Sequence, residues 1–593
     1  MTASGPALLP RPRRITPLPG AGAPKDAAIE VQQRAELGGE AFTLHTGGPA
    51  VQIAHGGANG LRYAQQCFAQ LQSNAGARLP ALAIEDSPDF PLRGYLLDVS
   101  RDRVPTRETL ALLVERLALL RINHLQLYTE HAFAYRGHEE VWRDASPLDA
   151  ADVAWLDGQC SAAGIELCAN QNTFGHMGRW LKLPRYRARA EAPQGVQTRL
   201  AGTLAPATLA PNEQNAAFAL SLCRELLAHH KSRRINIGCD ETFELGRGAS
   251  QQAVRARGRA HVFLEHLQRL LRGLHADGCE VLFWGDMLRG HPDCLRALPQ
   301  RDCIALAWHY EAPDPHAALP AGLRALFEDL GVAISPQQLR GFEGHVRAFA
   351  ESGLPFWVCP GTSTWNTLIG RLDNALGNLL DAAETGLAHG ARGYLVADWG
   401  DNGHMQPPAV SLPPLAYGAA VAWCSAANRD LEVAPLLDRF VFRDQAGVLG
   451  GVLNELGRLH AHTGQRVYNG SPLFTELTGA GRLGRTGDAD GGGVAAVIEQ
   501  LDGARAALSR ARPACADGEI TVREVQQAAR LARHGAWRMA RAAGFARPSD
   551  AELRADLEAA IAEQRECWLA RSRPGGLSDS LARLQKVLRE YAL

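Results

Sequence analysis

Residues 234–243 read Arg-Ile-Asn-Ile-Gly-Cys-Asp-Glu-Thr-Phe, and they decide how the rest of the chain is interpreted. Ile235 and Ile237 alternate with a polar residue, as expected of one short strand, and a glycine then precedes Asp240 and Glu241. Burying carboxylates unpaired is costly, so two of them at the end of an apolar strand either meet cations or carry proton chemistry on a substrate. The alternative is structural: Asp240 caps a following helix and Glu241 lies in its first turn.

Apolar strand-like runs alternate with amphipathic helical segments from residue 92 onward. The runs cover residues 93–100, 122–130, 165–172, 234–241, 279–287, 303–310, 356–364 and 393–401. This alternation implies an α/β fold in which parallel strands are joined by right-handed crossovers. Eight units favour a closed (β/α)8 TIM barrel over an open sheet, and in such barrels the functional groups lie at the carboxyl ends of the strands.

Three folded parts are expected, because 593 residues exceed one ordinary domain. Residues 1–24 are rich in Pro, Gly and Ala and are predicted to form a disordered tail; lacking a continuous apolar run, they do not predict a secretory signal. Residues 25–90 predict a small α/β domain and residues 91–430 the catalytic barrel. Residues 431–593 predict a helical domain that packs on the barrel or forms a homodimer contact, with nothing in it that suggests chemistry.

The net charge and the cysteine pattern argue against a nucleic-acid-binding, membrane or zinc-binding protein. The net charge is -1 and hydrophobic residues make up 46% of the chain, so neither a nucleic-acid partner nor a membrane partner is expected. The 12 cysteines are dispersed, without a C-x-x-C pair. We therefore expect reduced, mostly buried thiols in a cytoplasmic protein, and no zinc site built from them.

Acids and aromatic residues gather at the predicted strand ends. The residues there are Asp98, Ser100, Arg101, Glu130, His131, Asn172, Asp240, Glu241, Trp284, Asp286, Trp308, Tyr310, Thr364, Trp365, Asp398, Trp399 and Asp401, with His176 shortly after one end. A sugar stacks its C–H faces on indole rings while its hydroxyls bond to carboxylates. One tryptophan would more often be a core residue, but four at separate strand ends favour a sugar pocket. His176 alone would more often be structural.

Three segments carry a resemblance to a known family. They are Phe90-Pro-Leu-Arg-Gly-Tyr-Leu-Leu-Asp-Val-Ser-Arg101, Gly238-Cys-Asp-Glu241 and Trp399-Gly-Asp401. Together they resemble glycoside hydrolase family 20, the β-N-acetylhexosaminidases, over roughly residues 50 to 425. Two further segments, Leu127-Tyr-Thr-Glu-His131 and Gly137-His-Glu-Glu140, resemble its hexosaminidase D-like branch. The common Gly-Gly-Asp-Glu of the family is Gly-Cys-Asp-Glu here.

The resemblance implies an exo-acting, retaining β-N-acetylhexosaminidase in which the substrate's own acetamido group is the nucleophile, an exception to the usual two-carboxylate scheme. It implies that Glu241 is the general acid and base, that Asp240 orients the acetamido group, and that Tyr310 donates to the acetamido carbonyl. The other residues implied to bind the terminal N-acetylglucosamine or N-acetylgalactosamine are Arg93, Glu130, His131, His176, Trp284, Trp308, Trp365, Trp399 and Asp401. No metal and no organic cofactor is implied.

A protein of another class remains open at this stage. A barrel could keep the pocket for glycan recognition after losing turnover, since fold alone does not secure function. The intact Asp240–Glu241 pair favours the enzyme.

Overall fold

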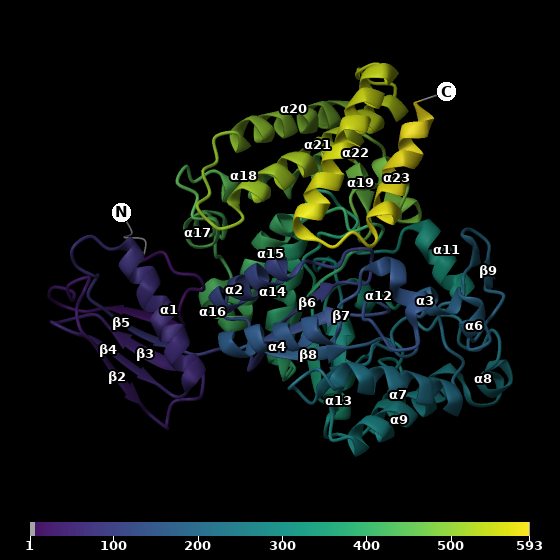
Figure 1. The fold of residues 1–593 in the computed structure, drawn as a ribbon, viewed down its shortest axis with the longest axis horizontal. Helices are drawn as coiled ribbons and strands as arrows, with labels where there is room; N and C mark the ends of the chain where they lie inside the picture. The colour runs from purple at the N-terminus through teal and green to yellow at the C-terminus, as the bar shows by residue number, and fades with distance from the viewer. Residues whose placement is uncertain (1–5, 592–593) are drawn as a thin grey trace.

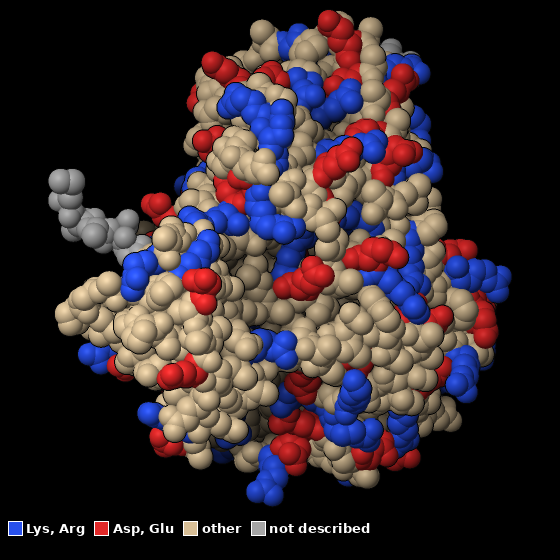
Figure 2. Space-filling model, turned by 60° about the vertical axis from the view of Figure 1, so that its left-hand side comes forward, with Lys and Arg blue, Asp and Glu red and all other residues tan. Residues whose placement is uncertain are grey.

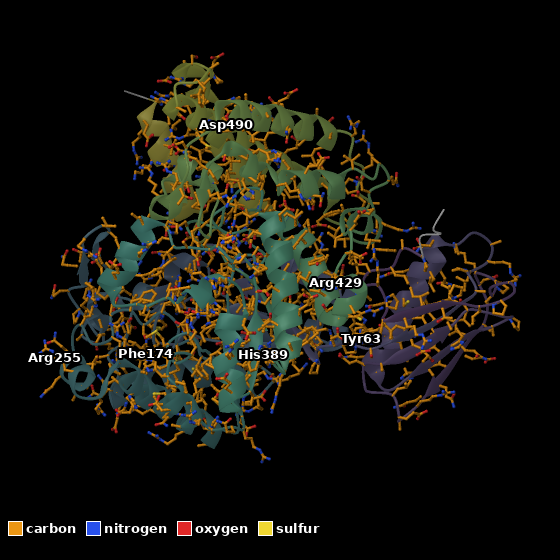
Figure 3. All side chains as sticks on the ribbon, turned by 180° about the vertical axis from the view of Figure 1, so that it is seen from behind. Tyr63, Phe174, Arg255, His389, Arg429 and Asp490 are labelled. Carbon is orange, nitrogen blue, oxygen red and sulfur yellow. The ribbon has the colours of Figure 1, made fainter. Side chains whose placement is uncertain are left out.

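The computed structural model describes residues 6–591 and contains three parts (Figure 1). A small α/β domain lies at one side, a barrel in the centre, and a helical domain above the barrel, against its outer helix α15 (Pro408–Trp423) (Figure 1). Viewed from behind, Tyr63 marks the first domain, Phe174 the barrel and Asp490 the helical domain (Figure 3). Lys and Arg alternate with Asp and Glu over the face in Figure 2, in keeping with the net charge of -1. Among the helices of residues 6–591, none has both the length and the apolar character needed to cross a membrane.

The N-terminal domain is a five-stranded sheet covered by helix α1 (Ala58–Asn74). Its strand order is β1-β5-β3-β4-β2, with β1 at Arg14–Pro17, β2 at Ile29–Gln33, β3 at Phe42–His45, β4 at Val51–His55 and β5 at Leu82–Asp86. The prediction of a disordered tail over residues 1–24 is wrong for residues 6–24, because β1 pairs antiparallel with β5 and Leu8 and Leu9 are buried. Residues 1–5 lie outside the described residues.

The central domain is a closed barrel of eight parallel strands, which confirms the predicted fold class. The strands are β6 (Leu92–Asp98), β7 (His124–Tyr128), β8 (Glu166–Asn170), β11 (Arg234–Asn236), β12 (Glu280–Trp284), β13 (Cys303–Trp308), β14 (Phe356–Cys359) and β15 (Gly393–Asp398). Each falls within, or begins one residue before, one of the eight predicted runs.

Helices surround the barrel, and α2, α4 and α7 among them begin at side-chain caps. The main ones are α2 (Arg107–Leu119), α4 (Ala150–Ala163), α7 (Glu213–Leu227), α9 (Arg259–Ala276), α13 (Glu343–Ser352), α14 (Leu372–Ala388) and α15 (Pro408–Trp423). Thr106 caps α2, and Asp149 forms a reciprocal capping box with Asp152 at the start of α4. These helices seal the outer face of the strands in one continuous apolar core.

The interior of the barrel has a second apolar core, and its layer at the carboxyl ends is aromatic. Leu96, Leu282, Leu306 and Leu395 fill the middle, whereas Trp284, Trp365 and Trp399 are at or just beyond the strand ends. Aliphatic side chains thus fill the middle of the barrel, and tryptophan rings lie at the carboxyl ends of its strands.

The C-terminal domain consists of α17 (Ala434–Leu436), α18 (Leu449–Leu456), α19 (Pro472–Thr478), α20 (Gly491–Leu508), α21 (Gly518–Ala542), α22 (Asp550–Arg571) and α23 (Leu577–Glu590). A buried ion network fastens it to the barrel: Arg571 donates to Asp517 at 2.5 Å, and Arg116 of α2 donates to the other oxygen of Asp517 at 2.6 Å. The Arg116–Asp517 pair joins the helical domain to the barrel, and Arg571 holds Asp517 in place from within the helical domain.

Candidate active site

A pocket of about 460 Å³, including its mouth, opens at the carboxyl ends of the barrel strands. It is lined by Arg101, His176, Asp240, Glu241, Trp284, Trp308, Tyr310, Trp365, Trp399, Asp401 and Asn469. Nine of the twelve residues predicted for the site line this pocket, and Glu130 lies directly behind it; Arg93 and His131 lie elsewhere.

The backbone that carries the acidic pair is unusual. Gly238, Cys239 and Glu241 have φ angles of +67°, +73° and +48°. A Cβ at position 238 would lie 1.6 Å from Oδ1 of Asn172, so only glycine fits there. The chain continues as a loop until α8 (Gln251–Arg257), so the alternative in which Asp240 caps a helix is wrong. Strain of this kind turns successive side chains in directions that a regular strand does not offer.

The two acids share one histidine. His176 Nε2 lies 3.1 Å from Oδ2 of Asp240 and 3.4 Å from Oε2 of Glu241. Burial lowers the pKa of His176, but the charge of Asp240 and the contacts with both acids outweigh this effect and raise the pKa well above its usual value. The raised pKa favours the protonated form of His176 between the two carboxylates, and both carboxylates stand on the same wall of the pocket.

A third acid supports Glu241 from behind. Asp286 Oδ2 accepts the backbone N–H of Glu241 at 3.2 Å. Burial, together with the nearby charge of Asp240, raises the pKa of Asp286 to about 7. The strand-end pattern included Asp286, but sequence reasoning gave it no role.

Arg101 is the arginine of the pocket. Its Nη1 donates to Asp98 Oδ2 at 3.0 Å, and its Nε lies 3.2 Å from Glu130 Oε1. The guanidinium carbon lies 5.1 Å from the centre of the Trp399 ring. Glu130 therefore acts behind the pocket wall by holding this arginine.

The prediction that Arg93 contacts the substrate is wrong. Arg93 is fully buried at the opposite end of β6, where its Nη1 donates to Glu40 of the N-terminal domain at 2.7 Å. Its Nε donates to the carbonyl of Arg121 at 2.9 Å. Arg93 therefore joins the barrel to the N-terminal domain and cannot reach a ligand at the carboxyl ends of the strands.

His131 also lies outside the pocket, which corrects its predicted role. Its ring faces a separate cavity beside Asp102 and Arg179, and burial lowers its pKa to about 3. Successive residues point to opposite sides as the chain leaves a strand, so Glu130 is directed toward the pocket and His131 away from it.

The aromatic wall consists of the four predicted tryptophans and Tyr310. Trp308 stacks on Tyr310 with ring centres 5.3 Å apart, and Trp365 meets the same tyrosine edge-on at 5.0 Å. The buried indole N–H groups of Trp284 and Trp308 have no hydrogen-bond partner among residues 6–591. Asp401 completes the rim, and burial raises its pKa to about 6.

Asn469 reaches the pocket from the helical domain, and sequence reasoning missed it. Asn469-Gly470 is a recognisable turn signal. The sequence gives no indication of where in the fold that turn lies, because the turn and the barrel loops it meets are about one hundred residues apart.

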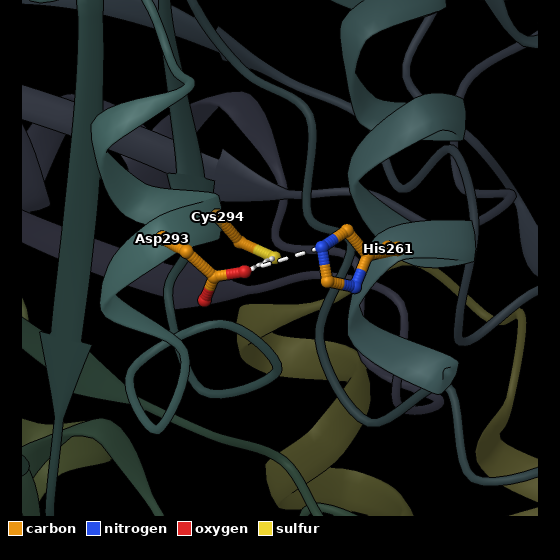
Figure 4. A group of neighbouring side chains, drawn as sticks. All are labelled: His261, Asp293 and Cys294. Atoms are coloured by element: carbon orange, nitrogen blue, oxygen red, sulfur yellow. Dashed lines mark hydrogen bonds and ion pairs between the residues drawn. The ribbon is translucent and has the colours of Figure 1, made fainter. Parts of the chain in front are cut away.

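One group of possible metal ligands lies outside the pocket (Figure 4). Within residues 6–591, His261, Asp293 and Cys294 are the one set of His, Cys and carboxylate donors with ligand atoms within 4.8 Å of one another. His261 Nε2 is 3.1 Å from Asp293 Oδ2, and both side chains are more than half exposed. An exposed ion pair of this kind contributes little to stability, and it has no contact with the acids of the pocket.

The chain is similar in sequence to part of two known proteins. No protein-family model matches the chain. Hexosaminidase D of Homo sapiens is 28% identical over 219 residues, which span 35% of this chain and 42% of that protein. Hexosaminidase D of Bos taurus is 25% identical over 178 residues, which span 29% of this chain and 49% of that protein. The chain thus matches about half the length, or less, of these relatives.

Solved structures show the same fold. The chitobiase of Flavobacterium johnsoniae has a TM-score of 0.55 at 13% identity, covering 98% of this chain and 99% of that one. A glycoside hydrolase family 20 exo-β-N-acetylglucosaminidase of Vibrio harveyi, in complex with N-acetylglucosamine, has a TM-score of 0.55 at 14% identity, covering 76% and 78%. The chain therefore has the fold of family 20 enzymes, in agreement with the resemblance drawn from the sequence.

Proposed function

We propose that this chain is an exo-acting, retaining β-N-acetylhexosaminidase that removes terminal β-linked N-acetylglucosamine or N-acetylgalactosamine. The observation that carries the proposal is the pair Asp240 and Glu241, which stand side by side on one histidine in a tryptophan-lined pocket. The fold shared with family 20 enzymes and the partial match to hexosaminidase D support it.

Neighbouring acids fit a reaction in which the substrate supplies the nucleophile. In the two-carboxylate scheme the acids flank the sugar from opposite sides. Here both approach one histidine nitrogen within 3.4 Å, so they address the same side of the ligand. The nucleophile, which is the second carboxylate in that scheme, must then come from the sugar itself. The 2-acetamido oxygen is the group placed to attack the anomeric carbon.

The two acids differ in exposure, and this separates their roles. The Glu241 side chain is 36% exposed and that of Asp240 is 11% exposed. Glu241 at the mouth gives a proton to the glycosidic oxygen as the C1–O bond breaks and the acetamido oxygen bonds to C1. It then takes a proton from water as that water attacks C1 and the bond between C1 and the acetamido oxygen breaks, which restores the acetamido group. Asp240, deeper in the pocket, holds the acetamido N–H and balances the positive charge of the cyclic intermediate.

The remaining wall holds the sugar. Tyr310 donates to the acetamido oxygen, and the four tryptophans enclose the methyl group and the ring face. Arg101 and Asp401 grip the outer hydroxyls, so Arg101 takes the role that the sequence assigned to Arg93. His176 keeps the two acids apart and supplies one positive charge between them.

The test is hydrolysis of the nitrophenyl β-N-acetylglucosaminide and β-N-acetylgalactosaminide. Wild-type protein should release nitrophenol, and Glu241→Gln should lose about 10²- to 10⁴-fold in kcat with an unchanged melting temperature. Glu213→Gln, a similar change at an exposed position on α7, is the control and should keep wild-type activity.

A thiazoline that mimics the cyclised intermediate should inhibit far more strongly than N-acetylglucosamine, because it resembles the state the pocket stabilises. Full activity in Glu241→Gln would contradict the assignment of the acid. Binding of N-acetylglucosamine without any hydrolysis would instead support the glycan-binding alternative.

A further inference from the structure

The helical domain enters the pocket through one tight turn. Strand β16 (Arg466–Val467) leads into Tyr468 and Asn469, and the chain reverses so that the N–H of Gly470 donates to the carbonyl of Val467 at 3.3 Å. Asn469 has a φ angle of +52°, in the left-handed region that asparagine tolerates better than most residues. Its side chain is therefore presented at the tip of the turn.

Loops from two barrel strands hold this turn in place. Glu311, which follows β13, accepts the backbone N–H of Asn469 at 3.0 Å, and Arg371 fixes that carboxylate with two hydrogen bonds of 3.0 and 2.8 Å. Asn366, which follows β14, donates to the carbonyl of Asn469 at 3.2 Å. The position of the turn is thus set by the same strand ends that build the aromatic wall.

The orientation of the Asn469 amide is fixed by a tryptophan. Trp365 Nε1 donates to Asn469 Oδ1 at 3.0 Å. An indole N–H can only donate, so the oxygen of the amide must face Trp365 and the NH2 group must face the other way. Among residues 6–591, Asn469 Nδ2 has no assigned acceptor, and the residue lines the pocket. A fixed donor without a protein acceptor is thus available to a ligand.

We propose that Asn469 binds the substrate, with Nδ2 donating a hydrogen bond to an oxygen of the terminal aminosugar, so that the helical domain completes the active site. This inference rests on the proposed function. It also gives a role to the domain in which the sequence shows no chemistry. The competing explanation is structural, with Asn469 needed only to hold Trp365 and to adopt the turn.

Two substitutions separate these explanations. Asn469→Asp keeps an acceptor for Trp365 and tolerates the left-handed backbone, but it loses the donor. Asn469→Gly keeps the backbone and loses the whole side chain. If Nδ2 binds the sugar, both variants should lose about tenfold or more in kcat/KM, in line with the loss of one hydrogen bond and an unpaired substrate oxygen. Binding of N-acetylglucosamine, followed by quenching of the pocket tryptophans, should weaken to a similar extent.

The control is Asn454→Asp, which adds the same charge on α18 of the same domain away from the pocket and should leave kcat/KM unchanged. Wild-type kcat/KM and sugar binding in Asn469→Asp, with or without a loss in Asn469→Gly, would overturn the proposal. Absence of hydrolysis by the wild type would contradict the proposed function instead. In that event the tryptophan quenching by N-acetylglucosamine still tests Asn469.

Discussion

Replacing Arg93 in the first barrel strand, and separately Arg101 just after that strand, should distinguish a residue needed for stability alone from one needed for hydrolysis. Arg93 is fully buried and gives Glu40 two hydrogen bonds, at 2.7 and 3.1 Å. Removing one partner of a buried ion pair typically costs about 3–5 kcal/mol. The Glu40 side chain keeps 18% of its surface in water, so we place Arg93→Met near 3 kcal/mol, about a hundredfold in the folding equilibrium.

The cost of Arg93→Met should depend on pH in one direction. Burial raises the pKa of Glu40, but Arg93 outweighs burial and holds that pKa below its usual value. The stability from this pair is therefore present at neutral pH and is lost as the pH falls through the folded pKa of Glu40. Wild type and Arg93→Met should differ most in melting temperature at neutral pH and converge as the pH falls below the usual pKa of a glutamate.

Arg101→Met should lower activity as well as stability. Asp98 keeps the backbone N–H groups of Ser100 and Gly400 as donors, but its buried carboxylate and that of Glu130 lose their cation, so part of the stability should be lost too. The lost charge-assisted bonds to sugar hydroxyls, at about 1.5–3 kcal/mol each, should lower kcat/KM by about tenfold to a hundredfold or more. Arg101→Lys should keep more of the wild-type kcat/KM than Arg101→Met but not all of it, because lysine lacks the planar guanidinium that bonds to two hydroxyls at once.

The assays are thermal melting by fluorescence across pH and hydrolysis of the nitrophenyl substrate. A variant Arg93→Met that melts like wild type but loses hydrolysis, together with an active Arg101→Met, would refute the placement of these residues at opposite ends of the barrel.

Two further predictions follow from buried titratable groups. The pKa of Asp286 is raised to about 7 in the folded chain, so the folded state binds the proton more tightly and stability falls as pH rises from about 4 to 7. Asp286→Asn keeps an acceptor for the Glu241 N–H, and it should melt at a higher temperature than wild type at pH 8 but not at pH 4. Equal melting temperatures of the two proteins at both pH values would contradict the raised pKa. Of the 12 cysteines, Cys515 alone is not fully buried. A thiol reagent should therefore modify at most this cysteine rapidly in the native protein, and all 12 in denaturant. Rapid labelling of several cysteines in the native protein would show instead that the core opens.

The barrel could be predicted from the sequence because its signal is local and repeated. Each strand is a short apolar run and each crossover an amphipathic helix, so an error in one unit leaves the others intact. The rule that function lies at the carboxyl ends then identified Trp284, Trp308, Trp365 and Trp399 before any contact was known.

The same rule would have distinguished Arg93 from Arg101. Eight residues of strand and its extension span roughly 26 Å at about 3.3 Å per residue, so the two arginines face opposite ends of the barrel. Arg93 begins the predicted run and Arg101 follows its end. The segment that resembles the family contains both arginines, so the motif alone does not distinguish them. The direction of the strand does, because it places Arg101 at the carboxyl end.

Other parts of the site depend on contacts that sequence pattern does not encode. Asn469 meets Trp365 across 104 positions of the chain, and nothing in either neighbourhood indicates the other. Strand β1 is only four residues long and is surrounded by Pro and Gly, so its composition suggests disorder although pairing with β5 orders it. Tertiary pairing overrides local composition in both cases.

The charges around the acidic pair explain how neighbouring acids can perform different tasks. Asp240, Glu241 and Asp286 crowd one wall, and three negative charges there would repel one another strongly. Burial and the charge of Asp240 keep Asp286 largely protonated below about pH 7, and the His176 imidazolium neutralises one of the remaining two. Asp240 is the acid nearer to His176, at 3.1 Å, and lies deeper in the pocket, where the positively charged intermediate forms. Glu241, farther from His176 and open to the mouth, is left to exchange a proton with the leaving group and then with water.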